Sequence, residues 1–417
     1  MSAKSTTAIL CVAALAALTA CIPNQKLKAP HQSPAVTGPF EVYFPDAEVI
    51  FTGPESIAEV ERKKRKEEES TIVEDMGSLE IGLLIPKTGA NAALGKDFED
   101  SAILALYDAK LAFPGGYRLT LLPTDTAGSP SVAVDAAQSL SDKGIGIMVG
   151  PLYSQSTEAI ATTVNPDLML SLSNNSDAAL GNSFVYGFTP EAEMLRGLAY
   201  ALKQNNNRVA AILPNNKYGR KLERVIRNTV PGFGANLDAI EFYVTTDEGR
   251  KAAATRLAQR IKSVSTGIVC FGDTKENSAQ IIKDMREAGV DVTGATKVGT
   301  SLWHDLEQPT PNVLQSTIYA ASDDRSYNRF MKRFKSAHGR VPSRLGVLIY
   351  DAITLLAEIA SQGTVPDRST LMAIEIIQGP AAGSYRFESD GSLMRALALY
   401  ELTPTSYKVI ENAPKSF

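Results

Sequence analysis

Ser154, Gln155, Ser156 and Thr157 place four hydrogen-bonding side chains in succession at the start of a predicted helix. Serine and threonine are favoured at helix starts, where their oxygens cap free backbone N–H groups. The same N–H groups attract a carboxylate, because the helix dipole is positive at that end. The run is therefore interpreted in two ways: it binds the carboxylate of a ligand, or its hydroxyl groups only cap their own helix.

Residues for catalysis do not come together in the sequence. The three histidines are His31, His304 and His338, and they stand far apart. No group of His, Cys and Asp has the spacing of a zinc site, and no nucleophile motif of the Gly-x-Ser-x-Gly type occurs. The glycines between 144 and 150 run through a predicted strand, so they do not form a nucleotide-binding loop. We expect no catalytic residue, no metal and no cofactor.

The N-terminus has the pattern of a lipoprotein signal peptide. Lys4 precedes an apolar run from Ala8 to Leu18, which is shorter than the about 20 residues of a membrane-spanning helix. The run ends in Leu-Thr-Ala-Cys, which resembles the lipobox of bacterial lipoproteins. Residues 1–20 are therefore predicted to be a signal peptide, and Cys21 is predicted to carry the lipid. The alternative is an ordinary signal peptide that contains a cysteine. Ile22 after the lipidated cysteine favours the outer membrane.

The other cysteines fit this interpretation. Cys11 would leave with the signal peptide, and Cys270 would remain alone in an apolar run of the mature chain, as a small core residue. Residues 21–78 are rich in Pro, Gln, Ser, Lys and Glu, which is typical of a flexible tether. Its charged segment from Glu59 to Glu69 is interpreted as a solvated helix or as a docking segment. The net charge of -4 gives no reason to expect nucleic acid as a partner.

From Leu79 onward, short apolar strands alternate with helices. Strands are expected at 79–85, 117–122, 145–149 and 168–172 in a first set, and at 208–213, 237–244, 266–271 and 297–299 in a second set. The intervening helices and this alternation indicate an α/β fold with mostly parallel sheets flanked by helices. Two successive sets predict two lobes. Ligands bind outside the carboxyl ends of parallel strands, so the loops at those ends are candidates for a site.

Several motifs, taken in order, resemble type I periplasmic binding proteins of the leucine/isoleucine/valine-binding family. The resemblance covers about Leu79 to Thr403, and the opening also resembles lipoproteins called penicillin-binding protein activators. The motifs are IGLLIPKTG at 81–89 with 91–95, GPLYSQST at 150–157, NKYG at 216–219, GTSLW at 299–303, YDA at 350–352, GSYRF at 383–387 and DG at 390–391.

The resemblance implies a two-lobed Venus-flytrap fold for residues 79–417, with three hinge crossings. The crossings are expected near 187–190, 319–322 and 381–385. Lobe 1 then comprises about 79–188 and 323–380, and lobe 2 comprises about 190–319 and 384–417.

The resemblance also implies ligand-binding positions. They are Leu94 in the first loop, residues 154–157, Asn174, Asn175 and, from lobe 2, Tyr218. Asn174 and Asn175 could instead form a simple turn, and Tyr218 could pack in the core. Amino-acid-binding relatives place an acid where this chain has Ser301. Asp273, Glu276 or Asp305 could take its place, but an α-amino acid ligand is in doubt because an unpaired buried ammonium is costly.

Two functions are consistent with these features. The first is a periplasmic solute-binding lipoprotein that holds a small polar ligand between its lobes, an amino acid being one candidate, and delivers it to an ABC permease. The second is a regulator that docks on a penicillin-binding protein and activates peptidoglycan synthesis. The long tether favours the second function, because a permease lies in the inner membrane while the lipid would hold this chain at the outer one.

Overall fold

The computed structural model describes residues 75–113, 115–204, 207–304, 309–314 and 317–415. The predicted signal peptide, Cys21 and nearly all of the predicted tether lie outside these residues. The tether was expected to extend to Ser78, but the first strand already begins at Asp75. The described residues fall into two compact units. Among them, no helix is both long and apolar enough to cross a membrane.

Unit 1 contains the described residues up to Gly187 and the segment Arg325–Leu393. Its main sheet has the order β2-β1-β3-β4-β5, and all of its pairings are parallel. The strands are β1 (Asp75–Ile85), β2 (Gly116–Asp125), β3 (Ile147–Val149), β4 (Leu168–Ser171) and β5 (Ser183–Val185). The helices are α3 (Ala92–Ala112), α4 (Pro130–Ser141), α5 (Ser154–Thr163), α10 (Asp324–His338), α11 (Gly346–Ser361) and α12 (Arg368–Met372), with the 3-10 helix η1 (Ser176–Ala178).

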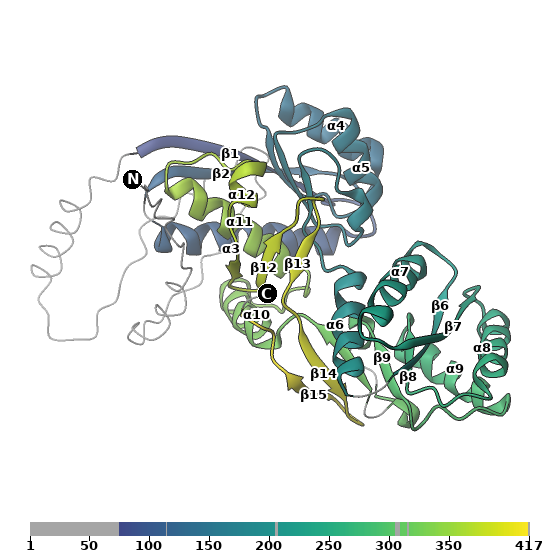
Figure 1. Cartoon of the computed structure of the whole chain (residues 1–417). Coiled ribbons are helices and arrows are strands. Elements are labelled where there is room, and N and C mark those ends of the chain that lie inside the picture. Colours follow the sequence, from purple (N-terminus) through teal and green to yellow (C-terminus); the bar gives the residue numbers. More distant parts are fainter. Residues whose placement is uncertain (1–74, 114, 205–206, 305–308, 315–316, 416–417) are drawn as a thin grey trace, which may run out of the picture. The chain divides into compact units, whose positions relative to one another are not determined.

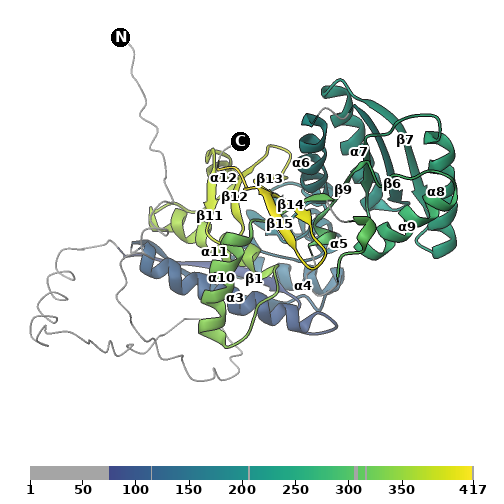
Figure 2. The ribbon, with the colours of Figure 1, turned by 90° about the horizontal axis from the view of Figure 1, so that it is seen from below.

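Helices cover this sheet because its central strands are buried along their whole length, as β3 and β4 show. Helices α4 and α5 pack beside each other, and α3 lies along α11 (Figures 1 and 2). Leu84 and Met148 from the sheet meet Ala137 and Ile160 from α4 and α5 in one apolar cluster. This packing fixes the loops at the carboxyl ends of the strands.

Unit 2 contains Phe188–Asp324 and Met394–Phe417. Its sheet has the order β15-β14-β10-β9-β8-β6-β7. The strands are β6 (Arg208–Pro214), β7 (Asn236–Tyr243), β8 (Ile268–Phe271), β9 (Thr296–Gly299), β10 (Ile318–Ala321), β14 (Ala398–Leu402) and β15 (Tyr407–Glu411). The helices are α6 (Pro190–Lys203), α7 (Lys217–Gly232), α8 (Asp247–Ile261) and α9 (Lys275–Glu287), with η2 (Ser301–Trp303) and η3 (Asn312–Leu314).

The sequence explains where the helices of unit 2 begin. Asn216, Thr246 and Thr274 each accept a hydrogen bond from the backbone N–H three residues later, and so cap α7, α8 and α9. One apolar cluster joins the sheet to α6 and α7, and a second joins it to α8 and α9. The predicted α/β class with two parallel-rich sheets is confirmed, although β14 and β15 run antiparallel to their neighbours.

The third boundary differs from the expectation. A crossing near 381–385 was expected, but the units divide between Leu393 and Met394. A small separate sheet lies here, in the order β11-β12-β13, built from β11 (Ile377–Gly379), β12 (Gly383–Phe387) and β13 (Leu393–Arg395), and the boundary falls within β13. Phe387 of β12 packs against Phe184 of β5, with ring centroids 4.5 Å apart, so this segment stays with unit 1. The first two boundaries fall between Gly187 and Phe188 and between Asp324 and Arg325.

Candidate functional site

The carboxyl edge of the unit 1 sheet brings two of the predicted loops together. Strand β1 has β2 on one side and β3 on the other, so the loops after β1 and β3 flank a topological switch point, where α/β sheets bind ligands. Asn91 from the first loop donates a hydrogen bond through Nδ2 to Tyr153 Oη from the second. Tyr153 is exposed. Sequence reasoning missed both residues, because nothing local marks them as a pair.

Asp125, at the end of β2, holds the first loop in place. Its carboxylate accepts the backbone N–H of Lys87 at 2.8 Å, that of Thr88 at 3.2 Å and the Thr88 hydroxyl at 2.6 Å. Burial alone would raise the pKa of Asp125, but the hydrogen bonds from Thr88, Ala127 and Lys87 lower it below its usual value. The loop is thus fixed by an ionised carboxylate.

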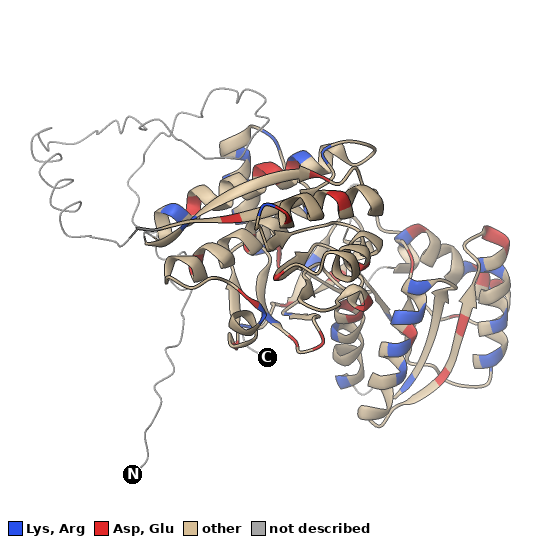
Figure 3. Cartoon of the chain, turned by 90° about the horizontal axis from the view of Figure 1, so that it is seen from above, with Lys and Arg blue, Asp and Glu red and all other residues tan. Residues whose placement is uncertain are grey.

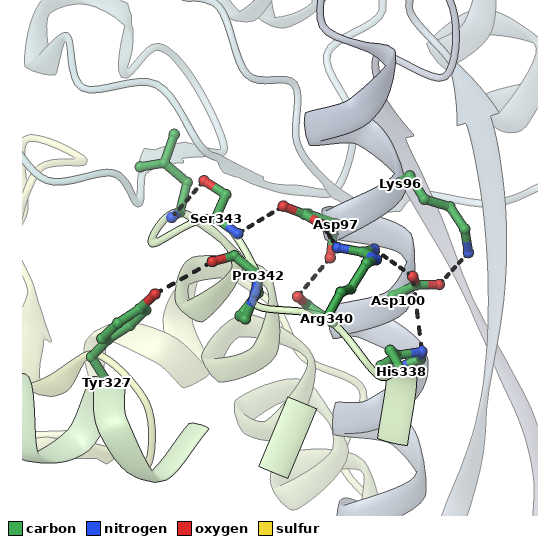
Figure 4. Close-up of polar contacts among 10 residues, drawn as sticks. Lys96, Asp97, Asp100, Tyr327, His338, Arg340, Pro342 and Ser343 are labelled. Carbon is green, nitrogen blue, oxygen red and sulfur yellow. Dashed lines mark hydrogen bonds and ion pairs between the residues drawn. The ribbon is translucent and has the colours of Figure 1, made fainter. Parts of the chain in front are cut away.

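Leu94 is half-buried in the first turn of α3. A polar network that includes Asp97 and Asp100 anchors this helix (Figure 4). Asp97 and Asp100, on the next turns, bind the segment that follows α10. The carboxylate of Asp97 accepts the backbone N–H of Ser343 at 2.7 Å, and Asp100 accepts Arg340 Nη2 at 2.6 Å. Arg340 also pairs with Asp97. This network ties α3, and with it Leu94, to the segment that follows α10.

Helix α5 begins at Ser154 with Tyr153 as its N-cap residue, and no side chain caps it. Its first free N–H groups are therefore open to an anion. Ser154 is half-buried and Gln155 is exposed. Ser156 is 1% exposed, and its Oγ has no hydrogen-bond partner in the described part of the chain. Thr157 instead points into the unit, where its hydroxyl lies 2.6 Å from Ser171 Oγ.

The two predicted asparagines differ in their roles. Asn174 is exposed at the end of β4, as a ligand contact would require. Asn175 accepts the backbone N–H of Asp177 through Oδ1 at 3.3 Å and caps the short helix η1. The alternative interpretation as a turn residue therefore describes Asn175 well.

In unit 2, the predicted residues follow the carboxyl ends of three strands. Tyr218 lies in the first turn of α7 after β6, Asp273 in the loop after β8, and Ser301 at the start of η2 after β9. The hydroxyl of Tyr218 lies 2.9 Å from Thr300 Oγ1, and burial raises the pKa of Tyr218. Tyr218 is thus a neutral hydroxyl, held against the loop that contains Ser301.

Both oxygens of Asp273 already accept hydrogen bonds from the protein. Oδ1 accepts the backbone N–H of Thr274 at 2.8 Å and Asn277 Nδ2 at 2.9 Å, and Oδ2 accepts the Tyr243 hydroxyl at 2.6 Å. Its backbone oxygen accepts Trp303 Nε1 at 2.8 Å. The alternative acid Glu276 is exposed in the first turn of α9, and Asp305 lies outside the described residues. Asp273 therefore acts as a structural centre of this loop.

An acid does reach the Ser301 position, from a helix that the sequence predicts but does not mark as part of the site. Glu193, in the first turn of α6, accepts the backbone N–H of Ser301 through Oε2 at 2.9 Å. Burial raises the pKa of Glu193 to about 7, although the hydrogen bonds from Ser301 act in the opposite direction. Among the described residues, the acids, histidines and cysteines form no group that could hold a metal ion.

A switch point with open helix N–H groups is typical of α/β sheets that bind small molecules, and the comparison with known proteins points to such proteins. A family model described as periplasmic binding protein matches residues 78–407. This chain belongs to the periplasmic binding protein family, in its type I, leucine/isoleucine/valine-binding form. The family comprises periplasmic solute-binding proteins of ABC transporters.

Individual relatives are distant. The chain is 25% identical over 269 residues to the uncharacterized protein RP748 of Rickettsia prowazekii, covering 60% of this chain and 70% of that protein. It is 22% identical over 292 residues to the leucine-, isoleucine-, valine-, threonine- and alanine-binding protein of Pseudomonas aeruginosa, covering 67% and 77%. A putative branched-chain amino acid ABC transporter structure from Rhodospirillum rubrum has a TM-score of 0.69 at 18% identity, covering 80% of this chain and 100% of that one.

Proposed function

We propose that this chain is a periplasmic solute-binding lipoprotein that holds a small polar ligand with a carboxylate and delivers it to an ABC permease. The observation that carries the proposal is the uncapped start of α5 beside the Asn91–Tyr153 contact, at the switch point of the unit 1 sheet. Open N–H groups at a helix start bind a carboxylate. The amino-acid-binding relative from Pseudomonas aeruginosa supports the same ligand chemistry.

Ligand binding is tested by measuring the Tm of the full chain carrying Cys21→Ser in the presence of each compound of a panel. The panel contains L-amino acids and carboxylic acids without an amino group. A ligand present at about 100 times its Kd stabilises the folded state by about 2.7 kcal/mol, which raises Tm by several degrees. If no compound of either group shifts Tm, the proposal fails.

A backbone substitution tests the role of α5. Ser154 is the first residue of the helix, where proline is tolerated and where Ser154→Pro removes one free N–H. Affinity for the carboxylate ligand should fall about tenfold, the effect of losing one charge-assisted hydrogen bond. Ser154→Ala keeps the N–H and is the matched control. Equal affinities of the two variants would show that the ligand does not contact this helix start.

The lipid anchor is a separate part of the proposal. Cys21→Ser should move the chain from the membrane fraction to the soluble periplasmic fraction, because the substitution removes the cysteine that carries the proposed lipid anchor. A variant that remains with the outer membrane would contradict the lipoprotein assignment.

A second function, activation of a penicillin-binding protein, is supported by the carboxylates of unit 2. Asp273 accepts hydrogen bonds from Tyr243, Thr274 and Asn277, and Glu193 accepts one from Ser301. Both acids therefore have partners within the protein, which favours a function that needs no amino-acid ligand. An ammonium group at this edge would have to displace those donors. Binding of the chain to a purified bifunctional penicillin-binding protein, with a faster glycosyltransferase or transpeptidase rate, is the test. Lack of binding at micromolar concentration would exclude this function.

A further inference from the structure

Five arginines gather around the edge strand β7 of unit 2. Helix α7 carries Arg220, Arg224 and Arg227, a spacing that places them on one side of the helix. Helix α8 carries Arg256 and Arg260, one turn apart. The two helices pack against β7 from opposite faces of the sheet, because α7 and α8 belong to different apolar clusters, so the arginines surround this sheet edge from both sides. All five are exposed, and Figure 3 shows blue segments gathered on the helices of this unit. We call these five residues the arginine face.

Each of the two acids within the arginine face pairs with two arginines and is more buried than their guanidinium groups. Glu223 pairs with Arg227 at 2.9 Å and with Arg220 at 3.2 Å, and Glu241 pairs with Arg256 and Arg260, each at 3.0 Å. The side chains of these four arginines are 50–56% exposed, whereas Glu223 is 19% and Glu241 is 13% exposed. Five positive and two negative charges leave a net charge of three, and the positive groups form the outer layer.

The guanidinium groups are also held in position. Arg256 Nη2 donates to the backbone oxygen of Phe242 at 3.0 Å, and Arg260 Nη1 donates to that of Ile240 at 3.4 Å. The guanidinium carbon of Arg220 lies 3.7 Å from the centroid of the Phe242 ring. Because these backbone oxygens belong to the outermost strand of the sheet and are already occupied, an added β-strand is not the occupant of this edge.

We propose that the arginine face binds an acidic segment of a protein partner. Arginine forks match carboxylates, and guanidiniums fixed before binding lose little freedom when they form such pairs. A bilayer is the less suitable partner, because sites that bind anionic lipids carry about four to eight basic charges close to the membrane surface. The face contributes three net charges in a chain whose net charge is -4. The proposal is independent of the ligand site.

The test uses the full chain with Cys21→Ser and a fluorescein-labelled poly-L-glutamate peptide, followed by fluorescence anisotropy at low and at physiological salt. Saturable binding that weakens with salt is expected. The double variant Arg224→Glu with Arg227→Glu should weaken it at least about tenfold, because reversed charges repel the peptide. The double variant leaves Arg256 and Arg260 unchanged, and these two residues hold the β7 backbone oxygens, so the edge stays closed.

The matched control is Lys332→Glu with Lys335→Glu, which makes the same change of charge at exposed positions of α10 in unit 1. It should leave the affinity within about twofold, and unchanged far-UV circular dichroism should confirm that both variants fold. No binding at low salt, or an equal loss in both variants, overturns the proposal. Binding to phosphatidylglycerol vesicles that depends on Arg224 and Arg227, without binding to the peptide, overturns it in favour of a lipid surface.

Discussion

The carboxylate of Glu193 accepts the backbone N–H of Ser301 at 2.9 Å, across 108 residues of sequence. The contact ties the first turn of α6 to the residue that follows β9 by two positions, so an acid from another helix reaches the position where the family resemblance implied one. Glu193 is 5% exposed. Its charge is therefore costly, and its protonation state couples to stability.

Replacing Glu193 with glutamine should make unfolding less dependent on pH. The pKa of Glu193 is raised to about 7, while that of an unfolded glutamate is 4.5. A carboxyl whose pKa is raised on folding stabilises the protein fully below the unfolded value, and that stabilisation is lost as pH rises through about 7. The loss amounts to about 3 kcal/mol. Urea unfolding near pH 5 and near pH 8 should show this loss in the wild type and a smaller one in Glu193→Gln. Identical pH profiles would contradict the assignment.

Asp351 should be essential for the stability of unit 1. Its buried carboxylate accepts the backbone N–H groups of Ala381 and Ala382 at 2.8 and 2.7 Å. An asparagine can accept only one of these hydrogen bonds, and its NH₂ group then faces the second backbone N–H, donor against donor. Asp351→Asn should lower the free energy of unfolding by about 2–3 kcal/mol in urea titrations. A loss below about 0.5 kcal/mol, the range of ordinary surface substitutions, would show that the two bonds contribute little.

Two glycines of α7 should respond in opposite ways to alanine. A Cβ at Gly219 would lie 1.9 Å from the backbone oxygen of Pro214, whereas one at Gly232 meets nothing within 4 Å. Gly219→Ala should therefore destabilise the protein by more than about 2 kcal/mol, since the backbone must shift. Gly232→Ala should be neutral or stabilise by up to about 1 kcal/mol. Thermal unfolding of the pair measures the contrast, and similar Tm values would contradict the packing of α7 on β6.

Cys270 should resist alkylation in the folded protein. It lies fully buried in β8, and burial raises the pKa of its thiol to about 12. The reactive thiolate is therefore scarce, and reagent access needs unfolding. Iodoacetamide followed by mass spectrometry should modify Cys270 only in denaturant. Modification at the same rate without denaturant would show that the strand is open to solvent.

The order of strands and helices followed from local patterns in the sequence. Runs such as Ile268–Phe271 are apolar throughout because both faces of the strand are covered, and helix starts such as Asn216 carry capping side chains. The fold class and the position of Ser154–Thr157 at a helix start were therefore predictable. The predicted signal peptide and Cys21 also rest on sequence alone, because they lie outside the described residues.

Only the tertiary structure decided which of these residues come together. Thr157 turns inward to Ser171, Asn91 reaches Tyr153, and Glu193 takes the place at Ser301. The third boundary moved to Leu393 because β11 pairs with β12 and Phe387 of β12 packs on Phe184 of unit 1. Such contacts join positions far apart in the chain, and they depend on packing geometry that no local spacing records. The sequence by itself thus determined the elements and their order, while side-chain direction and long-range pairing decided the site.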